Sequence, residues 1–255
     1  MPRLTIIAPA CNEAEVLPAF HTRLSAALDI SDLACQILYI DDGSSDATWA
    51  TITQLAQADA RVCALRLSRN FGKEAALTAG LDHVPATADA AIVIDSDLQD
   101  PPELIGQLIG AWQEGYDVVY ATRSERAGES TLKRFTAAAF YRLLASVSDT
   151  RIPQDTGDYR LLSRRALDAL RQLPERQRFM KGLFAWFGFK QTGIRYQREA
   201  RASGRSKWNY WRLCNLAIEG ITSFSVAPLR LATLAGGLTS AAAFAFGCWI
   251  LLKAL

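Results

Sequence analysis

An apolar run, Ala90 to Ile94, leads directly into a row of polar and acidic residues. Asp95 and Asp97 are two residues apart, and side chains at that spacing lie on one side of an extended strand. Gln99 continues the alternation. Two neighbouring carboxylates repel each other unless a cation lies between them, and a hard divalent cation can also bind phosphate oxygens. The spacing therefore favours a metal-assisted site for a nucleoside diphosphate.

The same residues also suit a structural turn between a strand and a helix. In that alternative, Asp97 or Asp100 caps a helix that begins at Pro101 and Pro102, because acidic residues and proline are both favoured at helix starts. The neighbouring loops decide between the two interpretations.

Four short apolar runs could form the strands that carry these loops. They alternate with segments of helical periodicity, and such alternation builds a parallel sheet with right-handed crossovers. We expect strands at Leu4–Ala8, Gln36–Ile40, Val62–Leu67 and Ala90–Ile94. In such sheets ligands gather at the carboxyl ends of the strands.

All four expected strand ends are polar and rich in turn residues. They read Pro9-Ala-Cys-Asn-Glu13, Asp41-Asp-Gly-Ser-Ser-Asp46, Ser68-Arg-Asn-Phe-Gly-Lys73 and Asp95-Ser-Asp-Leu-Gln99. Helix capping by Asn12, by Ser44 or Ser45, and by Gly72 would explain each loop separately. It would not explain why the acids and bases all fall on one rim, so we expect a binding site there.

The formal net charge of +2 hides a strong segregation of charge. Residues 1–122 carry a net charge of −11, and residues 123–230 carry +12. The acidic part suits metal-assisted nucleotide binding, and the basic part suits anionic lipid headgroups or a phosphorylated substrate. No zinc-finger spacing or RNA-binding signature occurs in the sequence, so we expect no nucleic-acid partner.

The cysteines and histidines show no metal-ligand or disulfide spacing. Five cysteines, at positions 11, 35, 63, 214 and 248, have no paired pattern, which is typical of reduced residues. His21 and His83 lie in expected helices far from any ligand spacing. The chain enters its first strand without a basic and apolar leader, so we expect no cleavable export signal before the first domain.

Residues 231–252 form an uncharged apolar run that is long enough to cross a bilayer core of about 30 Å. The alternative is a buried helix rich in alanine and glycine. Arg230 and the basic segment before it predict that residues 1–230 lie on the cytoplasmic side. Residues 208–230 contain Trp208, Tyr210 and Trp211, which suit the headgroup level, and they predict an interfacial helix. A buried amphipathic helix is the alternative there.

The motifs resemble those of a known family of enzymes. In chain order they are Pro9-x-x-Asn-Glu13, Asp41-Asp-Gly-Ser-x-Asp46, Arg69-Asn-x-Gly-Lys73, Asp95-x-Asp-x-Gln99, Asp155-Thr-Gly-Asp-Tyr-Arg160 and Gly204-x-Ser-Lys-Trp208. Over essentially the whole chain they resemble the inverting family-two glycosyltransferases, and most of all the polyprenyl-phosphate hexosyltransferases that include bactoprenol glucosyltransferases. Dolichyl-phosphate mannose synthases are more distant.

The resemblance implies an α/β fold of the GT-A type, with a mostly parallel, Rossmann-like sheet flanked by helices. The catalytic domain would span residues 1–207, followed by the interfacial helix at 208–230 and the membrane-spanning helix at 231–252. Related bacterial proteins commonly have a second spanning helix. The resemblance also implies a homo-oligomer, with a tetramer as the expected form.

The resemblance further implies how the donor is bound. Pro9, Asn12 and Glu13 would line the base and ribose pocket, and Asp41 or Asp42 would accept a hydrogen bond from the base. The sugar or diphosphate would lie near Arg69, Lys73 and Ser96. Mg²⁺ or Mn²⁺ would be held by Asp95, Asp97 and Gln99, with Asp97 the foremost ligand, and would neutralise the departing nucleoside diphosphate.

The acceptor implied by the resemblance is a polyprenyl phosphate. A phosphomonoester has a second pKa near about 6, so its attacking oxygen is already largely ionised at neutral pH and barely needs a base. Asp155 and Asp158 lie in the segment where the family has its candidate base, and we favour Asp158. Dolichyl-phosphate mannose synthases lack an acid there, and turn formation is the alternative role for both aspartates.

The main task is then to bind the donor diphosphate and the acceptor phosphate, and cationic side chains can bind both. The candidates for the acceptor phosphate or the diphosphate are Arg123, Arg126, Lys133, Arg134, Arg160, Arg201, Arg205, Ser206 and Lys207. We favour Arg123 and Arg134 for the lipid phosphate, and expect residues 205–207 to form a mobile loop.

The sequence thus predicts an enzyme of the bacterial inner membrane, with its catalytic domain in the cytoplasm, that transfers glucose from UDP-glucose to undecaprenyl phosphate. UDP-N-acetylglucosamine, UDP-galactose, GDP-mannose or a saccharide acceptor are alternatives, as is a membrane-tethered nucleotide-sugar sensor without activity. A processive synthase would carry Gln-x-x-Arg-Trp, and a P-loop enzyme G-x-x-x-x-G-K-[ST]; the sequence contains neither motif.

Overall fold

A computed structural model describes residues 3–31, 33–123, 156–173, 183–184, 188–197 and 227–254. These residues include one seven-stranded sheet with strand order β3-β2-β1-β4-β6-β5-β7. The strands are β1 (Arg3–Ala10), β2 (Ala34–Asp41), β3 (Val62–Arg66), β4 (Ala90–Val93), β5 (Val118–Arg123), β6 (Thr156–Ser163) and β7 (Gln191–Tyr196). The helices are α1 (Leu17–Asp29), α2 (Thr48–Ala58), α3 (Lys73–Asp82), the short η1 (Pro102–Leu104), α4 (Ile105–Gln113), α6 (Arg164–Arg171) and α9 (Ala227–Ala254).

The predicted parallel sheet is confirmed. Strand β1 pairs in parallel with β2 and β4, and β2 pairs in parallel with β3. Strand β6 runs antiparallel between β4 and β5, and β7 is parallel to β5. The described residues therefore form a mostly parallel, GT-A-like mixed sheet with helices, as the sequence predicts.

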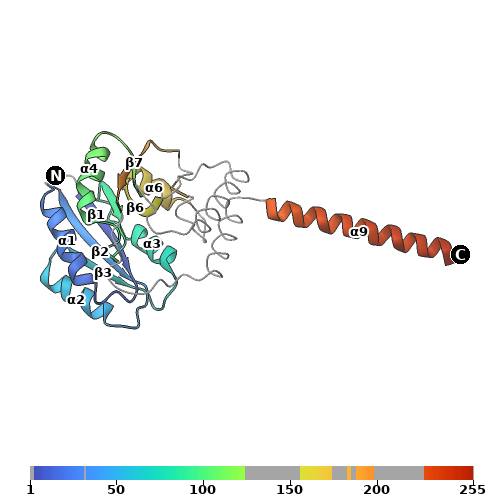
Figure 1. Ribbon diagram of the computed structural model, residues 1–255, viewed down its shortest axis with the longest axis horizontal. Coiled ribbons are helices and arrows are strands. Elements are labelled where there is room, and N and C mark those ends of the chain that lie inside the picture. Colours follow the sequence, from blue (N-terminus) through green and yellow to red (C-terminus); the bar gives the residue numbers. More distant parts are fainter. Residues whose placement is uncertain are drawn as a thin grey trace.

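Helices cover both faces of the sheet, which explains why β1 is apolar along nearly its whole length. Leu4 and Ile6 pack in one core cluster with α1 and α4, whereas Ile7 packs in a second cluster with α3 and α6. In Figure 1, α1 and α2 lie on one side of the strands and α3 and α6 on the other. This two-sided core holds the carboxyl ends of β1 to β4 along one rim.

Most of the helices do not begin at the residues that the capping alternative named. Helix α1 begins at Leu17, well after Asn12, and α2 begins at Thr48, after Ser44 and Ser45. Only Gly72 takes its expected place, at the N-cap of α3 with φ of 96°. Asn12, Ser44 and Ser45 therefore belong to the rim loops and not to helix ends.

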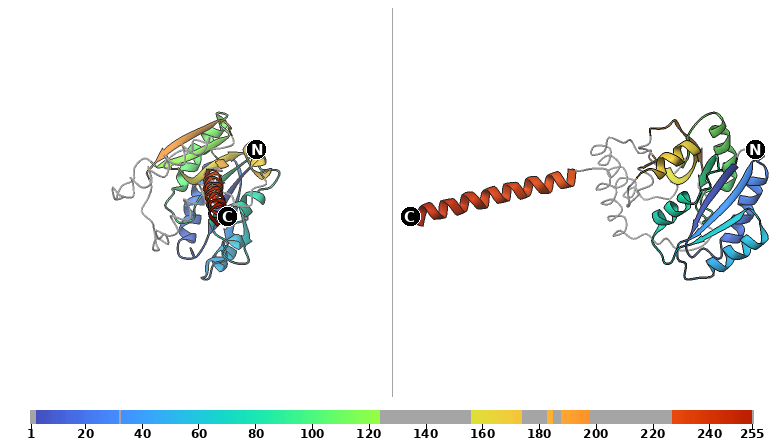
Figure 2. Two further views of the ribbon diagram at one scale, coloured as in Figure 1. Left: turned by 90° about the vertical axis from the view of Figure 1, so that its right-hand side faces the viewer. Right: turned by 180° about the vertical axis from the view of Figure 1, so that it is seen from behind.

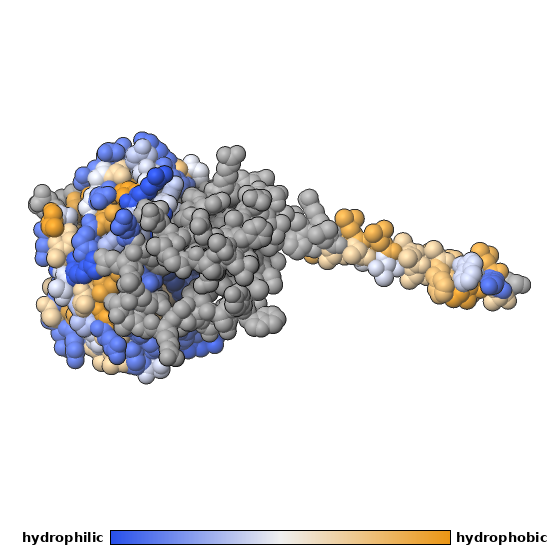
Figure 3. Space-filling view, viewed as in Figure 1, coloured by the Kyte–Doolittle hydropathy of each residue, from blue (hydrophilic) through white to orange (hydrophobic). Residues whose placement is uncertain are grey.

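Helix α9 is long and apolar enough, over Ala232–Ala254, to span a membrane, and none of its most apolar stretch is buried. It extends away from the sheet, as Figures 1 and 2 show. Leu238 and Phe244 on it are 73% and 75% exposed, and apolar residues cover most of its visible surface in Figure 3. Such exposure does not fit the buried-helix alternative. The helix begins at Ala227, before the predicted boundary at 231, and residues 208–226 lie outside the described part of the chain.

Candidate active site

The loops that follow β2 and β3 press against each other at Gly43. This residue has φ of +60°, in the left-handed region that favours glycine. A Cβ atom there would lie 2.2 Å from the carbonyl carbon of Arg69 and 2.4 Å from the backbone nitrogen of Asn70. The Asp41-Asp-Gly turn thus needs its glycine because another backbone occupies the space.

Asn12 and Glu13 connect the first loop to the second. The Asn12 N–H donates to Ser44 Oγ at 2.9 Å, and Asn12 Oδ1 accepts from the Ser45 N–H at 2.9 Å. The Glu13 N–H donates to Thr48 Oγ1 at 2.9 Å. Asn12 itself has φ of 56°. Its carboxamide therefore shapes the rim by joining two loops.

The two adjacent acids Asp41 and Asp42 have different surroundings. The Asp42 oxygens accept from the backbone N–H groups of Phe71 at 2.8 Å and Gly72 at 3.0 Å. Burial raises the pKa of Asp42, although these two hydrogen bonds lower it. Asp42 is thus bound to the loop before α3, which is a structural role that the sequence did not reveal.

Asp41 keeps one oxygen directed at an arginine. Its Oδ1 accepts from the Ser44 N–H at 3.0 Å, and its Oδ2 lies 3.3 Å from Arg66 Nε. The side chain is fully buried, and Oδ2 forms no hydrogen bond with any described residue. An open hollow of about 410 Å³ beside Arg66 is lined by Gly43, Ser44, Arg66, Leu67 and Ser68. The contact of Asp41 or Asp42 with a base stays a prediction.

Lys73 bridges two carboxylates at the centre of the rim. Its Nζ lies 2.7 Å from both oxygens of Asp95 and 2.5 Å from Asp158 Oδ2. Burial lowers the pKa of the Lys73 ammonium, but the charges of Asp158 and Asp95 outweigh burial and leave this pKa raised. Burial and the nearby charges of Asp158 and Asp100 raise the pKa of Asp95, although Lys73 lowers it. The structure thus brings together three residues that the sequence had assigned to different roles.

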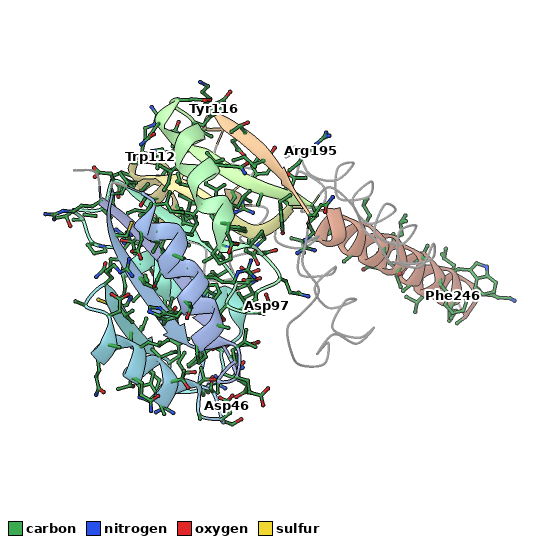
Figure 4. All side chains as sticks on the ribbon, turned by 60° about the vertical axis from the view of Figure 1, so that its left-hand side comes forward. Asp46, Asp97, Trp112, Tyr116, Arg195 and Phe246 are labelled. Carbon is green, nitrogen blue, oxygen red and sulfur yellow. The ribbon has the colours of Figure 1, made fainter. Side chains whose placement is uncertain are left out.

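The loop after β4 is held by its own hydrogen bonds. Ser96 Oγ donates to the Pro9 carbonyl oxygen at 2.9 Å, which joins this loop to β1. Asp97 Oδ1 accepts from the Gln99 N–H at 3.1 Å across Leu98, which has φ of 58°. Figure 4 shows Asp46 at the lower end of the domain and Trp112 and Tyr116 toward the upper end, with Asp97 between them on the side from which α9 extends.

The donor atoms near Asp97 suit a divalent cation that is shared with a ligand. Among the described residues, no group of three or more His, Cys, Asp or Glu side chains could hold a metal alone. Asp95 and Asp97 offer hard carboxylate oxygens from one loop, which is the chemistry that Mg²⁺ and Mn²⁺ prefer. The residues therefore fit a cation whose remaining ligands come from a bound diphosphate.

A second group of polar residues lies beside Gly157. The Tyr196 hydroxyl donates to Asp100 Oδ1, and both residues are buried. An ideal Cβ on Gly157 would lie 3.6 Å from Arg123 Nη2 and 3.8 Å from Asp100 Oδ2. The sequence analysis did not predict that Asp100 and Tyr196 lie together in this group. Asp100 does belong to the acidic run that begins at Asp95.

Arg160 faces inward. Its Nη2 donates to the Gly157 carbonyl oxygen at 2.7 Å, and its guanidinium lies 3.9 Å from the centre of the Phe184 ring. Burial lowers the pKa of Arg160 to about 10. The side chain is 4% exposed, which fits a structural role in β6 and leaves acceptor binding by Arg160 as a prediction.

The other predicted phosphate contacts divide into two sets. Arg69 stacks on Phe71 with its guanidinium 4.5 Å from the ring centre, and Phe71 is 49% exposed at the rim. The predicted phosphate contacts outside the described part of the chain are Arg126, Lys133, Arg134, Arg201, Arg205, Ser206 and Lys207. The candidate base Asp155 lies outside it as well.

Comparisons with known proteins agree with this geometry. Residues 5–171 match the family model described as glycosyl transferase family 2. The chain is 44% identical over 253 residues to the prophage bactoprenol glucosyl transferase homolog of Escherichia coli, covering 99% of this chain and 82% of the relative. It is 45% identical over 252 residues to an uncharacterized glycosyltransferase of Synechocystis, covering 99% and 79%.

A solved structure supports the fold. Glucosyl-3-phosphoglycerate synthase from Mycobacterium tuberculosis, in complex with Mn²⁺, UDP-glucose and phosphoglyceric acid, superposes with a TM-score of 0.56. The identity is 18%, and the match covers 86% of this chain and 77% of the other. The family match and the curated relatives, which extend over nearly the whole chain, establish that this protein belongs to glycosyl transferase family 2.

Proposed function

We propose that the protein transfers glucose from UDP-glucose to undecaprenyl phosphate, with inversion at the anomeric carbon. The observation that carries this proposal is the 44% identity, over 99% of the chain, to relatives named bactoprenol glucosyl transferase. The loop after β4, the start of α3 and the start of β6 supply the carboxylates and the ammonium that a nucleoside diphosphate and a cation require.

The Asp41 and Arg66 pair supports a uracil base. Because Asp41 Oδ1 already binds the Ser44 N–H, one acceptor, Oδ2, stands beside one donor group, Arg66. Uracil presents an N–H between two carbonyl oxygens and matches such a pair. An acceptor beside a donor is the arrangement expected of a uracil site, so UDP is the nucleotide of the proposed donor.

The metal proposal rests on Asp95 and Asp97. These residues would hold Mg²⁺ or Mn²⁺, which when bound neutralises charge on the departing diphosphate. Arg123, Arg69 and Lys73 would orient the phosphate groups by charge. The Asp158 carboxylate contacts the Lys73 ammonium, so Asp158 would position Lys73. The acceptor phosphate is itself a largely ionised nucleophile and would attack the sugar on the face opposite the leaving UDP.

The location is part of the same proposal. Helix α9 would span the bacterial inner membrane, and Arg230 with the basic segment before it would keep the catalytic domain on the cytoplasmic side. The acceptor then stays in the bilayer while its phosphate reaches the rim. A homo-oligomer, in the form of a tetramer, belongs to this proposal as well.

The test is a panel of labelled nucleotide sugars incubated with the protein, undecaprenyl phosphate and membranes, with and without EDTA. We expect one chloroform-soluble product, formed from UDP-glucose and lost with EDTA. Asp97→Asn should abolish it. Tight UDP binding without consumption of any donor would support a sensor instead, and a product that EDTA leaves unchanged would contradict the metal assignment.

A further inference from the structure

Asp158 lies near the start of β6, and Asp95 lies just beyond the end of β4, the strand that pairs with β6. The antiparallel ladder of β4 and β6 pairs Val93 with Arg160. Two residues after Val93 and two residues before Arg160, the continued register would set Asp95 opposite Asp158. Like charges at directly opposed positions destabilise a sheet. A cation is therefore needed at this place even in the absence of any ligand.

Lys73 supplies that cation. Its Nζ lies within 2.7 Å of Asp95 and 2.5 Å of Asp158, and the two acid side chains are 21% and 8% exposed. The backbone of Lys73 is fixed, because the Gly72 N–H that precedes it donates to Asp42. Its side chain, in contrast, is 43% exposed and has four rotatable carbons. The anchor of this lysine is rigid, while its charged end has room to turn.

The ammonium and a metal ion compete for the same carboxylate. Asp95 is one of the two acids that fit a divalent cation, and Lys73 contacts both of its oxygens. A cation that approaches Asp95 would meet the positive charge of Lys73 at short range, and two like charges that close repel each other. A diphosphate would remove the conflict, since it offers new negative charge to both cations.

We propose that Lys73 is a resident counter-ion that holds Asp95 and Asp158 in the donor-free protein and turns to the donor's diphosphate when donor and metal bind together. This inference rests on the proposed function. It assigns Lys73 a positioning role that makes metal binding depend on the nucleotide, so that the site does not fill with metal alone.

The test measures Mn²⁺ binding by the full chain in detergent, from the electron paramagnetic resonance signal of free Mn²⁺, with and without UDP. Wild type should bind Mn²⁺ weakly alone and at least about tenfold more tightly with UDP. Lys73→Met, which keeps the stem and removes the charge, should bind Mn²⁺ without UDP at least about tenfold more tightly than wild type. The increase in Mn²⁺ affinity that UDP causes should be smaller in this variant than in wild type.

Three further variants keep the test decisive. Lys73→Arg retains the charge and should resemble wild type. Lys190→Met removes an equal charge at the start of β7, where Nζ lies 4.2 Å from the centre of the Tyr116 ring, and should also resemble wild type. Lys73→Gln can still hydrogen-bond both acids, and replaces Lys73→Met if circular dichroism shows that the latter is unfolded.

The outcomes are distinguishable. Tighter nucleotide-free Mn²⁺ binding in the neutral variants supports the inference, and damage to the fold could not produce it. If wild type binds Mn²⁺ with UDP but the neutral variants bind it alone no better than wild type, Lys73 is not the counter-ion. If wild type binds no Mn²⁺ even with UDP, the metal-dependent function proposed above fails as well.

Discussion

The Asp42 carboxylate accepts a hydrogen bond from the backbone N–H of Gly72 at 3.0 Å, and thereby ties the end of β2 to the start of α3. Its other oxygen binds the Phe71 N–H. Asp42→Ala would leave both N–H groups without these acceptors, and we expect a loss of about 1 to 3 kcal/mol in the free energy of unfolding. Denaturant titration measures it. A loss of UDP binding with unchanged stability would instead indicate that Asp42 contacts the base.

Gly43 allows the two loops to meet, so a single methyl group should separate them. In Gly43→Ala the new Cβ would lie 2.2 Å from the Arg69 backbone, at a φ of +60°. We expect a loss of stability of about 1 to 3 kcal/mol and weaker UDP binding. Gly110→Ala is the matched control, because Gly110 lies in α4 with nothing within 4 Å of an added Cβ. That control should gain about 0.5 to 1 kcal/mol, and equal losses in both variants would contradict the loop argument.

Asp41 and Arg66 offer a test of base choice. Asp41→Asn replaces an acceptor by an amide beside Arg66 and should weaken UDP binding by about ten- to a hundredfold. Calorimetric titration with UDP in the absence of metal measures this change in affinity separately from any metal-dependent binding of the diphosphate. Asp46→Asn, on the same rim loop, is the comparison, since the Asp46 oxygens bind Thr48 and Ala14 at the start of the neighbouring helix and loop. Equal effects of the two substitutions would remove the assignment of Asp41 to the base.

The sheet was predictable because each strand run is apolar and bounded by polar turns. The four expected strands match β1 to β4 within a few residues at each end. The rim position of Asp95, Asp97 and Lys73 followed from parallel topology alone. The contact between Lys73 and Asp158 did not, since it depends on β6 running antiparallel beside β4, and no local pattern specifies which strand inserts there. The hydrogen bonds of Asp42 and Arg160 were missed for a different reason, because their partners are backbone groups that side-chain patterns do not reveal.

The ion pair of Arg61 and Asp59, far from the rim, should account for part of the loss of folding stability at low pH. The Arg61 guanidinium donates to Asp59 and lowers the pKa of that carboxyl below its usual range. A lowered pKa in the folded state contributes stability above about pH 4, and this contribution is lost as the pH falls through the folded value. Asp59→Asn should therefore lower stability at pH 7 by up to about 1 kcal/mol and reduce its fall between pH 5 and pH 3 to a similar extent, judged from denaturant curves at each pH. An unchanged acid dependence would contradict this.

The exposed surface of α9 predicts how a charge should affect membrane insertion. Ala243 lies at the middle of Ala232–Ala254, whereas Leu252 lies near its end and is 77% exposed. Ala243→Arg should cost about 2.5 to 3.5 kcal/mol of insertion and release a large share of the protein from membranes in a carbonate wash. Leu252→Arg adds the same charge where the side chain can reach the headgroups, so it should stay membrane-bound. Equal retention of both variants would show that α9 is held by something other than the hydrocarbon core, because only a bilayer distinguishes the two positions by depth.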